Sequence, residues 1–101
     1  MKNTYPLAEI KSLIRARQYR MSTQAILDAR KYFDLDEERI LTTVLTLSMR
    51  DFYKTMPSEL IPDTWQDVYH KAIFCRNRVS IAYIKLQIRK SRAFVISFKE
   101  K

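Results

Sequence analysis

The sequence predicts an α+β domain in which N-terminal helices pack on one face of a C-terminal antiparallel sheet. Three observations support this prediction. Apolar side chains recur at helical spacing through residues 6–47, and apolar and polar side chains alternate through residues 65–101, as is typical of strands. In addition, 101 residues of which 47% are hydrophobic can bury one modest core, so we expect a single domain over residues 1–101.

Three helices are expected in the first half of the chain. Pro6, at a first helical position, starts a helix that reaches about Arg17. Residues 19–21 should be a short extended piece, after which Ser22 caps a second helix. The acidic residues 36–38 suit the first turn of a third helix, because carboxylates interact favourably with the positive end of the helix dipole. The positions that these helices should bury are Leu7, Ile10, Leu13, Ile14, Ala25, Ile26, Ala29, Phe33, Ile40, Leu41, Val44 and Leu47.

A connecting segment follows the helices. Ser48 and Asp51 have the spacing of a capping box, which predicts a short helical turn over residues 51–56, DFYKTM. Pro57 should end this turn, because proline disfavours helical backbone in the residue before it. Residues 57–63, PSELIPD, then form a loop that leads to Trp65.

Residues 79–99 alternate as a hairpin, and burial of its apolar side chains predicts its register. Burying the apolar residues of both strands together gives the pairs Ile84 with Phe98, Leu86 with Ile96 and Ile88 with Phe94. This register leaves residues 90–92 as a three-residue turn. It also places Tyr83 opposite Lys99 on the polar face, with Cβ atoms about 5 Å apart, and Lys85 beside Ser97.

A further strand precedes this hairpin. A turn at residues 76–77, where Asn77 tolerates a positive φ, pairs Ile73 with Ser80 and Tyr69 with Ile84. The residues of this strand that should join the core are Trp65, Tyr69 and Ile73. Those expected on the face of Tyr83 and Lys99 are Gln66, Val68, His70, Ala72 and Phe74.

Composition limits the possible functions. Nineteen Lys and Arg residues against eleven Asp and Glu residues give a formal charge of +8, which favours a polyanionic partner, although a generally solvated basic surface would give the same charge. The single cysteine, Cys75, excludes an internal disulfide and fits a reducing compartment. Glycine is absent, which excludes a glycine-rich phosphate loop. No segment has the pattern of a signal peptide or a membrane span, so we expect a cytoplasmic protein that binds no membrane.

The residue types that remain favour RNA chemistry. One histidine and one cysteine, with no HExxH or CxxC motif, predict no metal site. The histidine, His70, has no nucleophile at a motif spacing and is expected to be an exposed strand residue. Lys, Arg, Tyr and Gln side chains on one sheet face can bind phosphates and stack on bases of single-stranded RNA. They could also cleave it by attack of a ribose 2′-OH on its own phosphate, if crowded positive charge lowers the pKa values of lysine and tyrosine.

Four segments carry a resemblance to a known family. DFYKTM at 51–56, WQDVY at 65–69, the strand around 83–85 and VISFKEK at 95–101 closely resemble the MqsR (motility quorum-sensing regulator) toxin family. The resemblance implies a RelE-like fold and the toxin of a type II toxin-antitoxin system. It also implies a metal-independent mRNA endoribonuclease, with no cofactor, that cleaves at GC-containing triplets such as GCU.

The resemblance also implies site residues and a partner. The family's catalytic positions fall on Lys54, Gln66, Tyr83 and Lys99. Residues expected to bind RNA are Met56, which matches a family position beside the site, and Lys85 and Arg89. The implied partner is an MqsA-like antitoxin with a zinc-binding domain and a helix-turn-helix domain, and the zinc would belong to that partner.

The chain departs from the family pattern in two places. After WQDVY it continues His70-Lys71-Ala72 instead of the usual Arg-Pro, and the last hairpin is one residue longer at residues 90–92. Because loops commonly carry specificity, these departures bear on substrate preference more than on activity. The alternative function is a non-catalytic RNA-binding or transcriptional co-regulatory module that acts with a DNA-binding partner and uses the basic face only for contact.

Overall fold

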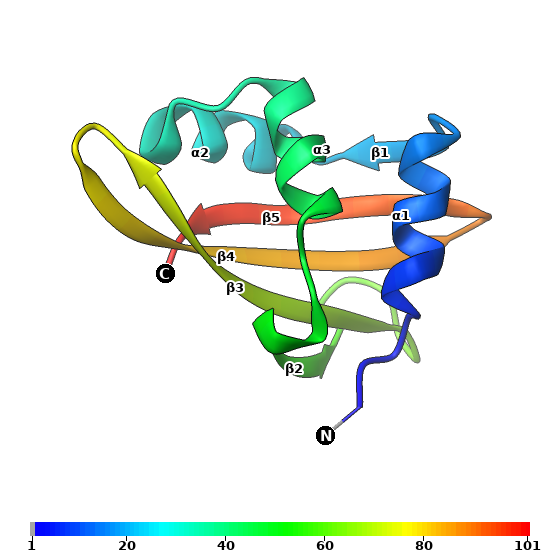
Figure 1. Ribbon diagram of the computed structural model, residues 1–101. Helices are drawn as coiled ribbons and strands as arrows, with labels where there is room; N and C mark the ends of the chain where they lie inside the picture. Colours follow the sequence, from blue (N-terminus) through cyan, green and yellow to red (C-terminus); the bar gives the residue numbers. More distant parts are fainter. Residues whose placement is uncertain (1) are drawn as a thin grey trace.

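The structure is a computed structural model that describes residues 2–101. It contains three helices, a short 3₁₀ turn and a five-stranded sheet, which confirms the predicted α+β class (Figure 1). The elements in chain order are α1 (Leu7–Arg15), β1 (Tyr19–Met21), α2 (Thr23–Phe33), α3 (Glu37–Leu45), the 3₁₀ turn (Met49–Asp51), β2 (Phe52–Pro57), β3 (Trp65–Cys75), β4 (Arg78–Arg89) and β5 (Arg92–Glu100). The sheet order is β1-β5-β4-β3-β2, and within residues 2–101 no helix is long and apolar enough to cross a membrane.

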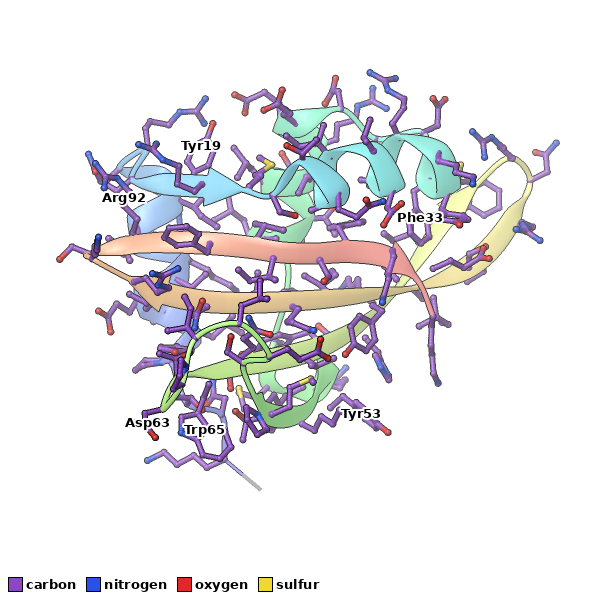
Figure 2. The ribbon with its side chains drawn as sticks, turned by 180° about the vertical axis from the view of Figure 1, so that it is seen from behind. Tyr19, Phe33, Tyr53, Asp63, Trp65 and Arg92 are labelled. Carbon is purple, nitrogen blue, oxygen red and sulfur yellow. The ribbon has the colours of Figure 1, made fainter. Side chains whose placement is uncertain are left out.

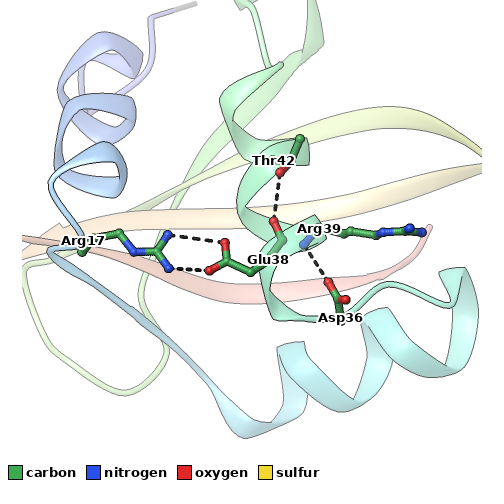
Figure 3. A network of polar contacts seen from close by, with 5 residues as sticks. All are labelled: Arg17, Asp36, Glu38, Arg39 and Thr42. Atoms are coloured by element: carbon green, nitrogen blue, oxygen red, sulfur yellow. Dashed lines mark hydrogen bonds and ion pairs between the residues drawn. The ribbon is translucent and has the colours of Figure 1, made fainter.

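The helices begin within one residue of the predicted positions, because Pro6 and Asp36 lie just before α1 and α3 and not inside them. The backbone N–H of Ala25 donates to Ser22 Oγ over 2.9 Å, and the N–H of Arg39 donates to Asp36 Oδ1 over 2.9 Å, so each cap satisfies an otherwise unpaired backbone donor. Figure 3 shows the second of these caps beside the ion pair between Arg17 and Glu38, which ties the end of α1 to the start of α3.

The core lies between the helices and one face of the sheet. Phe33 of α2 packs edge to face on Phe98 of β5, with ring centroids 5.8 Å apart. All the helix positions expected to be buried are buried except Leu13 and Ile26, which are half-buried. Figure 2 looks onto the opposite face of the sheet, in front of which the loop between β2 and β3 passes.

The helical turn expected over residues 51–56 is wrong. The capping box exists, since the N–H of Ser48 donates to Asp51 Oδ2 over 2.9 Å, but it closes a single 3₁₀ turn that ends at Asp51. Residues 52–57 form β2, which pairs antiparallel with β3 at the edge of the sheet. A capping box signals where a helical turn starts and says nothing of its length, and aromatic and β-branched residues such as Phe52, Tyr53 and Thr55 suit a strand.

The register between β3 and β4 confirms the prediction. Tyr69 pairs with Ile84 and Ile73 with Ser80, and the turn residues Arg76 and Asn77 have φ values of 54° and 63°. These left-handed values at both turn positions match the twist of the flanking strands.

The burial predicted for Trp65 is wrong, because its side chain is 45% exposed. The neighbouring residue on the core side of β3 is the buried carboxylate Asp67, which accepts from the N–H groups of Thr4 and Tyr5 over 2.9 and 2.8 Å. The N-terminal segment therefore covers this end of β3, and along this strand the fully buried apolar core ends at Tyr69.

The register between β4 and β5 is correct for half of its length. Tyr83 pairs with Lys99, Ile84 with Phe98 and Lys85 with Ser97, as predicted. A β-bulge then shifts the pairing by one residue, so that Leu86 pairs with Val95 and Ile88 with Ala93, and the predicted pairs of Leu86 with Ile96 and Ile88 with Phe94 are wrong. Ala93 and Val95 are therefore the buried residues of this half of β5.

The turn explains the bulge. Lys90 and Ser91 have φ values of 49° and 59°, which makes a two-residue turn whose twist suits a hairpin, in place of the expected three-residue turn over 90–92. Because the turn is one residue shorter, β5 has one residue more than its partner strand, and Ile96 is this extra, unpaired residue of the bulge. Its carbonyl accepts a hydrogen bond from Ser22 Oγ over 2.7 Å. The extended piece at 19–21 is confirmed as β1, which pairs parallel with β5.

Candidate active site

Four side chains from four strands form a row across the sheet face that the helices leave open. They are Tyr53 of β2, His70 of β3, Tyr83 of β4 and Lys99 of β5, here called the transverse row. The rings of Tyr53 and His70 stack with centroids 4.3 Å apart, and the His70 and Tyr83 centroids are 5.9 Å apart. Lys99 Nζ lies 5.1 Å from the centre of the Tyr83 ring. The row follows from the register, which pairs His70 with Tyr83 and Tyr83 with Lys99.

A β-bulge positions the β2 end of this row. The pairing of β2 with β3 shifts between Phe52, which lies opposite Tyr69, and Lys54, which lies opposite Val68, so Tyr53 is the extra residue. Bulges commonly re-aim side chains near functional sites. Here the bulge lets Tyr53, labelled at the β2 edge in Figure 2, stack on the imidazole, with Lys54 Nζ 5.6 Å from the Tyr53 ring centre.

Other side chains that were predicted to belong to the site surround Tyr83. Lys85 Nζ lies 5.9 Å from the centre of the Tyr83 ring, and the Tyr83 hydroxyl donates to Met56 Sδ over 3.7 Å. The structure thus brings Lys85, Met56 and Lys99 around one phenol on a half-buried part of the sheet.

A small pocket of about 100 Å³ adjoins this group. It is lined by Ser58, Glu59, Leu60, Gln66, Lys85 and Ile96. Gln66, expected to be catalytic, is buried here, two residues before Val68, which lies opposite Lys85. Sequence reasoning missed Ile96 because only the bulge in β5 moves it to this face, and it missed Glu59 because the loop has no pattern that fixes its fold.

Arg89 lies apart from this group. It is six residues beyond Tyr83 on β4, which corresponds to about 20 Å at about 3.3 Å per residue. Its guanidinium lies 5.6 Å from the centre of the Phe94 ring, close to the turn that joins β4 and β5. A role of Arg89 in RNA binding would therefore concern a distant part of the RNA chain.

The comparison with known proteins agrees with the resemblance seen in the sequence. Residues 2–100 match the model of the family described as "Motility quorum-sensing regulator, toxin of MqsA". The chain belongs to the MqsR toxin family. One relative is the mRNA interferase toxin MqsR of Escherichia coli (strain K12), which is 32% identical over 95 residues that span 94% of this chain and 91% of that protein. The family predicted from the sequence is thereby confirmed.

The electrostatics of this MqsR-family site differ from the prediction for its tyrosine. Burial raises the pKa of Tyr83, and the charges of Tyr53 and Glu59 act in the same direction, so the expected lowering is wrong. Burial lowers the pKa of Lys85, and Lys99 and Lys54 lower it further against the opposing effect of Glu59. At neutral pH Tyr83 therefore keeps its proton, whereas Lys85 loses its proton more readily than an ordinary lysine.

His70 is the residue of this MqsR-family site that sequence reasoning passed over. Its expected exposure is wrong, because it is half-buried beside the two tyrosine rings of the transverse row. Burial is the largest cause of the lowered pKa of His70, and the charges of Lys101 and Lys54 lower it further. The signal that could have found it was present in the register, which placed His70 on the same face as Tyr83. Among residues 2–101, His, Cys, Asp and Glu side chains form no group of three or more that could hold a metal ion.

Proposed function

We propose that this MqsR-family protein is a cytoplasmic, metal-independent mRNA endoribonuclease and the toxin of a type II toxin-antitoxin pair. The relative named as an mRNA interferase toxin supports the reaction class. The observation that supports the site is the gathering of Lys85, Lys99 and Met56 around the Tyr83 phenol on an open sheet face.

The proposed reaction is attack of a ribose 2′-OH on the adjacent phosphorus. The O2′–P bond forms, the P–O5′ bond breaks, and the products are a 2′,3′-cyclic phosphate and a free 5′-OH. Tyr83, whose raised pKa keeps it protonated, is suited to give a proton to the leaving 5′ oxygen. Lys99 and Lys54 would neutralise charge that develops on the phosphate, which is the main source of catalysis in phosphoryl transfer. Gln66 is suited to orient the RNA rather than to transfer protons.

Specificity and partner follow from the family. We propose cleavage at GC-containing triplets such as GCU, with bases read near the pocket at Gln66 and the loop over residues 58–64, because loops commonly carry specificity. The partner would be an MqsA-like antitoxin with zinc-binding and helix-turn-helix domains, and the zinc would be held by that partner.

The deciding experiment incubates the pure protein with a GCU-containing RNA in EDTA and maps the ends of the products. We expect cleavage that EDTA does not reduce, with a 2′,3′-cyclic or 3′-phosphate on one product and a 5′-OH on the other. A matched RNA with a single 2′-deoxyribose at the cleaved position should stay intact. An absolute requirement for Mg²⁺ with a 5′-phosphate product would contradict the mechanism. Salt-sensitive binding without any cleavage would favour the alternative, a non-catalytic RNA-binding module.

A further inference from the structure

His70 is the only imidazole in the chain, and it lies in the middle of the transverse row. Tyr53 stacks on it from β2 at 4.3 Å with an angle of 22° between the rings, and Tyr83 lies directly opposite it on β4. Two neighbouring strands and a β-bulge therefore hold this ring beside the phenol proposed as the proton donor.

The proposed reaction needs a proton acceptor as well as a donor. A histidine has an ordinary pKa near 6.5, whereas tyrosine and lysine titrate near 10, so an imidazole is the side chain best suited to accept a proton at neutral pH. A base is most effective when its pKa lies close to the working pH.

We propose that His70 is the proton acceptor that activates the ribose 2′-OH during RNA cleavage by this protein. This inference rests on the proposed function. The imidazole takes the proton from O2′ as the O2′–P bond forms, and Tyr83 gives its proton to O5′ as the P–O5′ bond breaks. Return of one proton from the imidazolium to the phenolate, through water, restores both groups.

The groups that face His70 favour its proton-free form. Tyr53 and Lys54 face it from β2, Tyr83 from β4, and Lys101 from the residue after β5, while Lys99 of β5 lies beside the Tyr83 ring. Burial and the charges of Lys101 and Lys54 lower the pKa of His70, so the acceptor is ready at pH 7. Cleavage should accordingly fall only as the pH drops through a value below the ordinary 6.5 of histidine.

The test is the pH dependence of kcat/KM for cleavage of the GCU-containing RNA by the wild type and His70→Gln. We expect His70→Gln to lower kcat/KM at pH 7 by about 10²-fold or more and to remove the acid limb of the profile. The matched control is Phe74→Leu, which changes an exposed side chain on the same face of β3 and should leave the profile unchanged. An acid limb that survives in His70→Gln would point to another acceptor, such as Lys85, and would overturn the inference while the proposed function stands.

Two further measurements test the inference, and the first keeps it testable even if His70→Gln folds poorly. Because the chain has one histidine, its ring signals in an NMR titration of the wild type need no assignment, and their pKa should match that of the acid limb. A difference of more than about one pKa unit would overturn the inference.

The second measurement is rescue by added imidazole. It should restore cleavage at least about tenfold to His70→Ala but not to His70→Gln, where the glutamine side chain fills the gap. Equal rescue of both variants, or of neither, would also overturn the inference. A wild type that cleaves no RNA would instead count against the proposed function.

Discussion

The two faces of the sheet use consecutive residues of the same strands for different purposes. Tyr69, Ile84 and Phe98 are fully buried under the helices and lie opposite one another across β3, β4 and β5. The residues next to them in the chain, His70, Tyr83 and Lys99, form most of the transverse row on the open face. Burial energy fixes the pairing of the first set, and the second set inherits that pairing because side chains alternate along a strand. The core thus positions the proposed chemistry without touching it.

The largest effect should come from breaking the core side of this arrangement. Leu86 is fully buried, and Leu86→Ala should lower the free energy of unfolding by about 2 to 5 kcal/mol through lost apolar burial and the cavity left behind. Urea unfolding measures this change. A loss below about 0.5 kcal/mol, as is usual at surface sites, would mean that this face is not the buried one.

Substitutions on the open face should have their large effect on RNA cleavage and not on stability. Tyr83→Phe and Lys99→Ala should each lower cleavage by about 10²-fold or more, and the double variant should be little worse than the poorer single variant, because the two residues act on the same phosphate. Single-turnover cleavage and urea midpoints are measured together. The folding free energy should change by no more than about 0.5 kcal/mol, and near-wild-type cleavage by both single variants would refute the site.

The bulge in β5 gives a sharper comparison within one strand. Val95 is buried in the core and Ile96 faces the small pocket, so Val95→Ala should cost about 1.5 kcal/mol of stability or more, from two lost methyl groups. Ile96→Ala removes more apolar surface but should cost less. Thermal or urea unfolding of the two variants decides between the observed register and the unbulged one, which predicts the reverse order.

The smallest effect is expected at a helix cap far from the row. Asp36→Ala removes the acceptor for the N–H of Arg39 and should cost about 1 kcal/mol of stability. Cleavage at a temperature where the variant is fully folded should be unchanged. Asp36→Asn, which keeps an acceptor oxygen, is the matched control and should lose less stability. A fall in cleavage without a change in stability would show that the helix cap affects the transverse row by some route other than the stability of the fold.

Sequence patterns predicted most of what burial determines. The helices, the cap at Ser22 and the pairing of Tyr83 with Lys99 all follow from apolar spacing or cap chemistry, whereas Asp36, expected inside the first turn of its helix, is the cap. The bulge at Ile96 did not follow, because it depends on non-glycine residues at Lys90 and Ser91 adopting left-handed backbone, which a sequence pattern does not favour. The extended backbone at residues 19–21 was predicted, but its parallel pairing with β5 was not, because three residues are too few to show an alternation.

The site was predictable only in part, for a related reason. Side chains on the open face are not selected by burial, so the register says which of them are neighbours but not which of them touch. The stack of Tyr53 on His70 depends on a bulge in a strand that the sequence had suggested was helical. The roles of Lys54, Gln66, Tyr83 and Lys99 come from the family resemblance and remain predictions, whereas their positions near one another follow in part from the sheet.

The strand order β1-β5-β4 also affects the rate of folding. β5 is the last strand of the chain, yet it lies between β4 and a parallel partner, β1, that is far away in sequence. Contacts of such long sequence separation form slowly, because closing a large loop costs chain entropy before any contact repays it. Lys99 meets Tyr83 within the local hairpin of β4 and β5, so this part of the row depends only on short-range contacts. The pairing of β5 with β1 should therefore limit how fast the whole fold, and with it the cleavage activity, returns in a stopped-flow refolding experiment.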